Sequence, residues 1–306
     1  MANPHKIAVL AELQRRFGDV RKLKGSESLF VIGREAARVY FRYSKVHSRG
    51  RTFFGLRRAD LRSLEGQNSY IVFLLGDGSP PLFITYADFE NVFHRAEPAS
   101  DGQYKVQLLT GPSALELYIA RQGRFNVEGY VGMETLERSI DAQKLRQARL
   151  LGHFQVQTLV AAIGHAKGYD VWIPDNNLCK LDWTITKQFE LRRSLPTGFE
   201  SVSRILSEID VVWIRSGSSY IEGLYEVEHS TPIYSGLLRF NDILLTNPKL
   251  SQFWIVSNDV RRELFAQQVF RPTFKKSGLA EVCSFLDYAN VDSWHQRLIG
   301  GNNENL

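Results

Sequence analysis

The chain has 306 residues, of which 43% are hydrophobic and 23% charged, and its formal net charge is +5. This length and composition predict a soluble globular protein with two domains of ordinary size. Its two cysteines, Cys179 and Cys283, are too few for a disulfide framework or a structural zinc site. No segment approaches the roughly 20 apolar residues needed to cross a bilayer, and the first residues lack the apolar run of a secretory signal. We therefore expect a cytoplasmic protein without a membrane partner.

The positive charge is concentrated near the start of the chain. Residues 1–65 contain 15 Lys and Arg against 6 Asp and Glu, an excess of 9 positive charges. Such an excess predicts a polyanionic partner, here nucleic acid, although a solvated charged face is the alternative.

The first elements are predicted to be one helix followed by strands. Apolar residues at helical spacing predict a helix from about Ile7 to Phe17. Short segments rich in aromatic and β-branched residues, separated by Gly, Pro, Asp and Ser, predict strands at SLFVI, RVYFRYSKV, RTFFGL, SYIVFLL, PLFITY, YKVQLL and ALELYIA. Residues 1–137 are therefore expected to form a mostly antiparallel β domain.

Basic and aromatic residues alternate within this domain, from residue 38 to residue 58. Rings can stack on bases and cations can pair with phosphates, so we expect a DNA-recognition surface. In the alternative, the rings form the β core and the cations only face solvent. The predicted DNA-binding residues are Arg42, Lys45, Arg49, Arg51, Arg57 and Arg58.

The second part of the chain, residues 138–306, is predicted to mix helices and strands. The segment METLERSIDAQKLRQARLLGHFQVQTLVAAIGHAKG is expected to link the two domains and then to form the first core helix, which Gly168 should end. The following elements are expected at GYDVWIP, FESVSRILSE, IDVVWI, IEGLYEVEHS, SGLLRFNDILL, QFWIVS and DVRRELFAQQ. Nearly continuous apolar strands between helices indicate an α/β core with a mixed central sheet. The fold class expected is therefore α+β, with two domains.

Three carboxylates interrupt two of these apolar strands. Asp210 and Glu226 are each eight residues from Ser218, so a symmetric hairpin would place them opposite one another. Side chains alternate along a strand, so Glu228 shares the face of Glu226 while Val227 points away.

Like charges in an apolar sheet raise one another's pKa, and a hard divalent cation would remove this conflict. Oxygen ligands predict Mg²⁺, with Mn²⁺ as a substitute. The alternative is that both glutamates lie on the wet face of an edge strand and that Asp210 caps a turn.

The order of these elements and residues resembles the core of the PD-(D/E)XK nuclease superfamily, the restriction-endonuclease-like fold, over about residues 145–270. The family pattern is an Asp on one strand and Glu-x-Lys on the next. Asp210 and Glu226 match it, whereas Glu228 stands where Lys is usual. Some restriction enzymes of the superfamily use Glu at that position.

The resemblance implies roles for several residues. Asp210 and Glu226 would bind the metal, with the carbonyl of Val227 as a further ligand, and Glu228 would orient or deprotonate a water. Superfamily members often add a polar residue from the preceding helix, which makes His153 and Gln157 auxiliary candidates, with a buried structural role as the alternative. The remaining candidates are His229, which alternates to the face opposite Glu228, and Arg239, which could reach a phosphate or form a surface ion pair.

The function expected is that of a Mg²⁺-dependent DNA endonuclease concerned with restriction or defence against foreign DNA. Cleavage of both strands of double-stranded DNA needs two active sites, so a homodimer is expected. One alternative is a transposition or repair nuclease of the same superfamily. Another is a non-catalytic DNA-binding protein whose nuclease domain is degenerate. Hydrolysis of a sugar polymer by paired carboxylates would leave the basic region unexplained.

Overall fold

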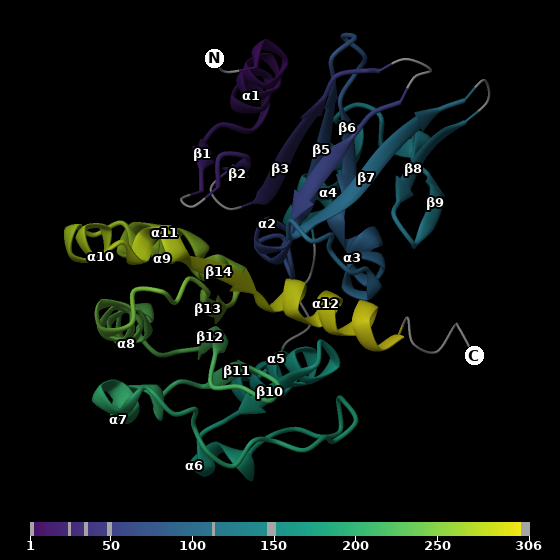
Figure 1. The fold of residues 1–306 in the computed structure, drawn as a ribbon. Coiled ribbons are helices and arrows are strands. Elements are labelled where there is room, and N and C mark those ends of the chain that lie inside the picture. The colour runs from purple at the N-terminus through teal and green to yellow at the C-terminus, as the bar shows by residue number, and fades with distance from the viewer. Residues whose placement is uncertain are drawn as a thin grey trace. The chain divides into compact units, whose positions relative to one another are not determined.

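In the computed structural model of the protein, the described residues are 3–23, 26–33, 36–47, 51–111, 114–145 and 151–300. The chain divides into two compact units, Met1–Arg146 (unit 1) and Gln147–Leu306 (unit 2), which are described separately (Figure 1). The domain boundary expected at 137/138 falls inside a helix of unit 1. Neither Cys179 nor Cys283 forms a disulfide. In the described part of the chain, no helix is both long and apolar enough to cross a bilayer.

Unit 1 contains the first nine strands. Its elements are α1 (Pro4–Phe17), β1 (Val20–Lys22), β2 (Leu29–Ile32), β3 (Ala37–Ser44), β4 (Phe54–Arg57), α2 (Arg58–Arg62), β5 (Ser69–Leu75), β6 (Leu82–Thr85), α3 (Tyr86–Arg95), β7 (Gln103–Thr110), β8 (Leu115–Ile119), β9 (Gly123–Asn126), η2 (Glu128–Tyr130) and α4 (Glu134–Leu145). All seven strands expected here are present. The expected helix begins earlier than predicted because Asn3 caps it and Pro4 starts its first turn.

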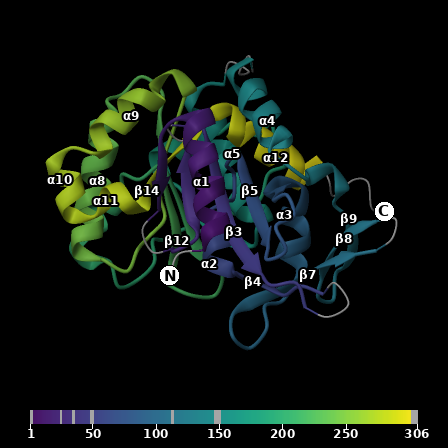
Figure 2. The ribbon, with the colours of Figure 1, turned by 90° about the horizontal axis from the view of Figure 1, so that it is seen from above.

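Two sheets pack face to face in unit 1. The first has the order β1-β2-β3-β5-β6 and is antiparallel except for the parallel β3–β5 pair, and the second, β4-β7-β8-β9, is antiparallel throughout. Helix α1 lies over one face of the first sheet (Figure 2), where Leu13 of α1 and Leu136 of α4 join the core, and the second sheet covers the other face. Strand β5 therefore lies between two layers, which explains why its seven residues are all buried.

Sequence patterns missed several elements of unit 1, among them β1, β9 and α3. Strands β1 and β9 are short and only partly buried, so neither carries a clear alternation of apolar and polar residues. Helix α3 buries Phe89 and Phe93 on its inner face, but it follows β6 without any residues between them, so no break in the sequence marks the change.

Unit 2 is built on one mixed sheet. Its elements are α5 (His153–Ala166), β10 (Tyr169–Trp172), α6 (Asp175–Leu178), η3 (Glu200–Val202), α7 (Ser203–Leu206), β11 (Val211–Arg215), β12 (Ile221–Glu228), α8 (Ile233–Thr246), β13 (Phe253–Ser257), η4 (Asp259–Arg261), α9 (Arg262–Val269), α10 (Pro272–Ser277), α11 (Leu279–Val282), β14 (Cys283–Asp287) and α12 (Tyr288–Gly300). The strand order is β10-β11-β12-β13-β14. Pairs from β10 to β12 are antiparallel and pairs from β12 to β14 are parallel. The expected α+β class with a mixed sheet in the second part is confirmed.

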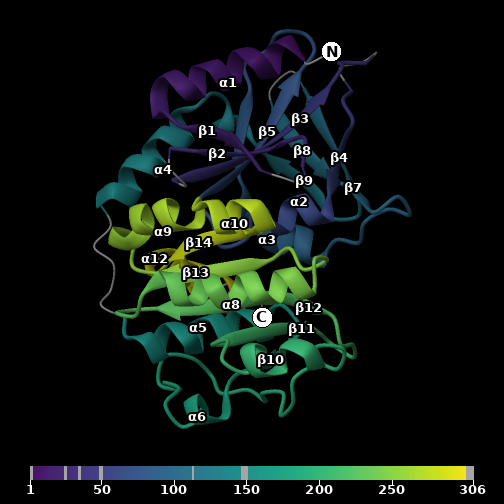
Figure 3. The same ribbon diagram turned by 90° about the vertical axis from the view of Figure 1, so that its left-hand side faces the viewer.

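Helices cover both faces of this sheet. On one face, α8 and α9 pack against a core that includes Leu224 and Ile255; Figure 3 looks onto this side, with α8 in front of β12 and β13. On the other face, α5 and α12 pack against Tyr225 and Val227. Helix α5 ends at Ala166, and Gly168 follows two residues later, where the helix was expected to stop. Its φ of 78° is a conformation that favours glycine. Strand β14 and helix α12 were not expected from the sequence.

Candidate active site

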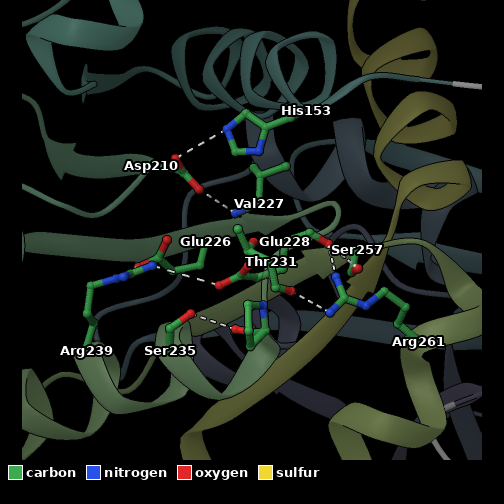
Figure 4. A network of polar contacts seen from close by, with 11 residues as sticks. His153, Asp210, Glu226, Val227, Glu228, Thr231, Ser235, Arg239, Ser257 and Arg261 are labelled. Atoms are coloured by element: carbon green, nitrogen blue, oxygen red, sulfur yellow. Dashed lines mark hydrogen bonds and ion pairs between the residues drawn. The ribbon is translucent and has the colours of Figure 1, made fainter.

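The three predicted carboxylates meet at one end of the unit 2 sheet, where β12 ends and β11 begins (Figure 4). The pair Val211–Tyr225 follows the predicted symmetric register, and Asp210 directly precedes it, next to the position of Glu226. A bulge does occur, between Trp213 and Ile214. It lies on the turn side of the hairpin, so the register at the carboxylates is preserved.

Asp210 is held by contacts from two elements. Its Oδ2 accepts a hydrogen bond from the backbone N–H of Val227 at 2.8 Å. Its backbone carbonyl accepts one from Gln157 Nε2, also at 2.8 Å, and its Oδ1 lies 3.5 Å from His153 Nε2. The two auxiliary candidates on α5 therefore both contact Asp210. Burial alone would lower the pKa of His153, but the hydrogen bond and negative charge of Asp210 outweigh it and the pKa is raised.

Glu226 is a buried carboxylate paired with one guanidinium. Its side chain is 1% exposed, and its Oε1 accepts a hydrogen bond from Nε of Arg239 on α8 at 2.5 Å. Burial raises its pKa well above 4.5, Arg239 opposes this rise, and the charges of Asp210 and Glu228 add to it. Arg239, the residue predicted to contact a phosphate, therefore forms an ion pair with Glu226, a residue predicted to bind the metal.

Glu228 lies on the same face, toward α8. The hydroxyl of Thr231 donates to its Oε2. Its Oε1 is buried without a hydrogen-bond partner among the described residues, and this oxygen is 3.9 Å from Nη2 of Arg239. Burial is the main cause of the raised pKa of Glu228.

The backbone that follows Glu228 is fixed by two residues that the sequence pattern did not indicate. Arg261 donates from Nη1 to the carbonyls of Glu228 at 2.8 Å and His229 at 3.1 Å, and from Nη2 to that of Thr231 at 2.6 Å. The hydroxyl of Ser257 also donates to the Glu228 carbonyl. Ser257 pairs with Glu228 at the carboxyl ends of two parallel strands, where α/β sheets place their ligand sites, and this position is a signal that could have identified it.

A glycine of α8, also missed, allows the helix to approach the acidic strand. A Cβ at Gly236 would lie 2.8 Å from Glu228 Oε1 and 3.4 Å from the Cβ of Glu226. Contacts this short would force Glu228 to move, because α8 and β12 are both packed in the core.

His229 takes no part in this cluster. It is exposed, stacks on Tyr288 of α12 with ring centroids 6.1 Å apart, and lies 3.5 Å from the Tyr288 hydroxyl through Nδ1. It therefore points to the face opposite Glu228, as the alternation along β12 predicts.

Comparison with known proteins places this cluster in a family. Residues 135–303 match the model of a family described as the type II restriction enzyme NmeDI C-terminal domain, which is more than half of the chain. The chain belongs to this family. It is similar to the type II restriction enzyme NmeDI of Neisseria meningitidis serogroup C, with 31% identity over 134 residues. That alignment covers 40% of this chain and 37% of the relative. No solved structure matches the chain.

The family segment contains every residue of the cluster, from His153 to Arg261. Within it, Asp210 lies beside His153, both glutamates lie beside Arg239, and Arg261 binds the backbone carbonyl of Glu228. The unpartnered Oε1 atoms of Glu228 and Gln157 are acceptors that a cation could use. These features fit a small hard cation.

The protein side chains alone do not complete a metal site. Considering only the residues that the structure describes, no three His, Cys, Asp or Glu side chains are placed to hold a metal ion together. A cation at Asp210 and Glu226 would take further ligands from backbone carbonyl, water or substrate phosphate, which is the usual behaviour of Mg²⁺.

The basic residues predicted to bind DNA in unit 1 lie on several elements. Lys45 and Arg51 lie in the connection between β3 and β4, and Arg42 lies near the end of β3. Arg57 ends β4 and Arg58 begins α2. All except Arg42 are exposed, and Arg42 is half-buried with its guanidinium 5.6 Å from the ring centroid of Tyr40. Arg49 lies outside the described residues. None of these positions falls in the family segment.

Proposed function

We propose that the protein is a divalent-metal-dependent DNA endonuclease of the type II restriction class, acting in defence against foreign DNA in the cytoplasm. The observation that carries this proposal is that Asp210, Glu226 and Glu228 lie at one end of a mixed sheet, close enough for the charges of Asp210 and Glu228 to act on Glu226, inside the segment that matches a restriction-enzyme family. We further propose that unit 2 is a PD-(D/E)XK core in which Glu228 replaces the usual Lys. Unit 1 is then the DNA-recognition domain, and cleavage of double-stranded DNA is carried out by a homodimer.

The contacts of the cluster suggest how the residues share the reaction. Asp210, Glu226 and the Val227 carbonyl are the proposed ligands of Mg²⁺, which when bound would polarise the scissile phosphodiester and lower the pKa of a water. Val227 N–H and Gln157 hold the orientation of Asp210. Arg239 is the cation positioned beside both glutamates, and its N–H groups other than the Nε–H bonded to Glu226 would contact a phosphate oxygen.

Glu228 Oε1 is the proposed proton acceptor. It has no hydrogen-bond partner in the described structure, and its raised pKa favours the uptake of a proton. The water oxygen would bond to phosphorus, and its proton would pass to Oε1. One P–O ester bond would break, with its electron pair leaving on the ester oxygen, which would take a proton from solvent. Thr231 holds the other carboxylate oxygen, so that Oε1 keeps its direction during this transfer.

Plasmid cleavage tests this proposal. Supercoiled and linear DNAs, unmodified and methylated, would be incubated with Mg²⁺, with Mn²⁺ and with EDTA. We expect cutting that requires a divalent cation and falls by about 100-fold or more in Asp210→Asn, Glu226→Gln and Glu228→Gln. Glu208→Gln removes the same charge from an exposed side chain outside the site and should cut normally. Light scattering on the DNA-bound protein would test the homodimer.

The ion pair between Glu226 and Arg239 favours a second candidate function. Arg239 already neutralises a predicted metal ligand, as would suit a DNA-binding protein that has lost catalysis. Calorimetric titration with Mn²⁺ separates the two. A nuclease should bind Mn²⁺, and Asp210→Asn and Glu226→Gln should weaken this binding by about 10-fold or more. A non-catalytic protein should bind DNA but give no Mn²⁺ signal in any of these forms.

A further inference from the structure

The aromatic residues of the basic stretch in unit 1 separate into a buried group and an exposed group. Tyr40, Phe41 and Phe54 are at most 3% exposed and belong to the core. Tyr43 and Phe53 are 42% and 56% exposed. The core explains the first group, whereas the second group lies outside it.

The two exposed rings lie on one anchored segment, which we call the β3–β4 arm: its described residues are Tyr43–His47 and Arg51–Phe53. The two sides of the arm are joined by a hydrogen bond from His47 N to Arg51 O at 2.8 Å. Arg51 also forms a β-bridge with Leu109 of β7. Close to Phe53, the buried hydroxyl of Thr52 donates to the Leu108 carbonyl at 3.1 Å and accepts from the Leu108 N–H at 2.7 Å.

These contacts hold the backbone of the arm, so its exposed rings need no packing partner of their own. The His47 and Phe53 rings meet edge to face with centroids 5.9 Å apart, and Val46 of the arm is also exposed. A surface of this kind on a folded unit marks an interaction site more often than isolated exposed side chains do.

The charge of the arm indicates the class of partner. Its described residues include Lys45 and Arg51 but no Asp or Glu, and Arg42 precedes it directly. A second copy of the arm would bring like charges together across a two-fold axis, whereas a polyanion would be attracted. Arg57 and Arg58 are not part of this surface, because six residues of extended chain place Arg57 roughly 20 Å from Arg51.

We propose that the β3–β4 arm is the element through which unit 1 contacts duplex DNA, an inference that rests on the proposed function for the identity of the partner. Lys45 and Arg51 bind phosphates, and Tyr43 and Phe53 pack against bases or sugars in a groove. Proteins that read DNA in this way combine cations for the backbone with apolar or aromatic side chains that enter between or beside bases.

DNA binding measured by fluorescence anisotropy tests this proposal. The full-length protein would be titrated into a labelled duplex in EDTA, at several salt concentrations. We expect Phe53→Ala and Tyr43→Ala to weaken binding by about 10-fold at every salt concentration. Lys45→Ala and Arg51→Ala should each lower the slope of log affinity against log salt by about 0.9, because each removes one phosphate contact. Phe53→Leu, which keeps an apolar side chain, should lose less affinity than Phe53→Ala.

Two matched controls lie elsewhere on unit 1. Val131→Ala shortens another exposed apolar side chain, and Arg95→Ala removes an exposed charge on α3. Both should bind DNA as the wild type does, and thermal melting would establish that all variants are folded.

The outcomes separate this proposal from the proposed function. If the wild type binds and cuts DNA and the four arm variants bind as tightly as the controls, the arm proposal is overturned and the nuclease remains. If the variants instead change the oligomeric state on a sizing column with DNA binding intact, the arm is a protein interface and the proposal is again overturned. A wild type that neither binds nor cuts any duplex overturns both.

Discussion

Arg239 gives the sharpest test of how the acidic cluster is held together. Its guanidinium is the cation bonded to Glu226, whose side chain is 1% exposed, while Arg239 itself is 26% exposed. Replacing it with Met keeps a long apolar side chain in α8 but leaves a buried carboxylate without its partner. Removing one partner of a buried ion pair costs about 3–5 kcal/mol. Because Arg239 is partly accessible to water, we expect the lower end, about 3 kcal/mol, for the metal-free protein at pH 8.

The destabilisation should depend on pH. In the folded protein the pKa of Glu226 lies well above its ordinary value of 4.5, and removing Arg239, which lowers it, should move it further up. A carboxyl group with a raised folded pKa loses stability as the pH rises from its unfolded pKa through its folded pKa. Below both values Glu226 is protonated in wild type and variant, so the difference between them should be small near pH 4 and larger at pH 8.

Urea denaturation followed by tryptophan fluorescence measures this effect in the correct part of the chain, because the five tryptophans all lie in unit 2. Arg204→Met, an exposed substitution on α7, is the control and should change stability by less than about 0.5 kcal/mol. Glu226→Gln combined with Arg239→Met should recover part of the loss, since no buried charge remains. The reasoning would be refuted if Arg239→Met matched the wild type at pH 8, or lost the same stability at both pH values.

The same variant also reports on the metal. In the wild type a cation at Glu226 must compete with Arg239 for Oε1. If the site binds a divalent cation, Mn²⁺ should therefore raise the unfolding midpoint of Arg239→Met more than that of the wild type. Equal shifts, or none, would count against a cation at Glu226.

Three further substitutions test the support around Glu228. Gly236→Ala places a Cβ 2.8 Å from Glu228 Oε1, and we expect DNA cleavage to fall by about 100-fold with binding unchanged; normal cleavage would show that this oxygen has no role. Thr231→Val removes the hydroxyl bonded to Oε2 and should lower kcat by about 10-fold without raising KM, whereas a change in KM alone would contradict a role in orienting Glu228. Arg261→Gln removes the guanidinium that donates to three backbone carbonyls, so it should lower kcat, and Arg261→Lys should restore part of the loss. Urea midpoints of the Gly236, Thr231 and Arg261 variants would show whether a loss of folding explains the results.

Much of the fold and part of the site follow from local patterns. Alternation along β12 put Glu226 and Glu228 on one face and Val227 and His229 on the other, which agrees with the cores and contacts observed. The symmetric hairpin also predicted the register beside Asp210. These inferences succeeded because a strand has a period of two and a hairpin relates residues that are close in sequence.

Only the tertiary structure decided which groups surround the carboxylates. Arg239, Gly236, Ser257 and Arg261 reach the site through a helix and a parallel crossover, and no local period relates such segments. The same limit applied in unit 1, where Tyr40 and Tyr43 look alike in the sequence but one is buried and the other exposed. Burial depends on which layers cover each face of a sheet, and that is determined by packing between elements distant along the chain.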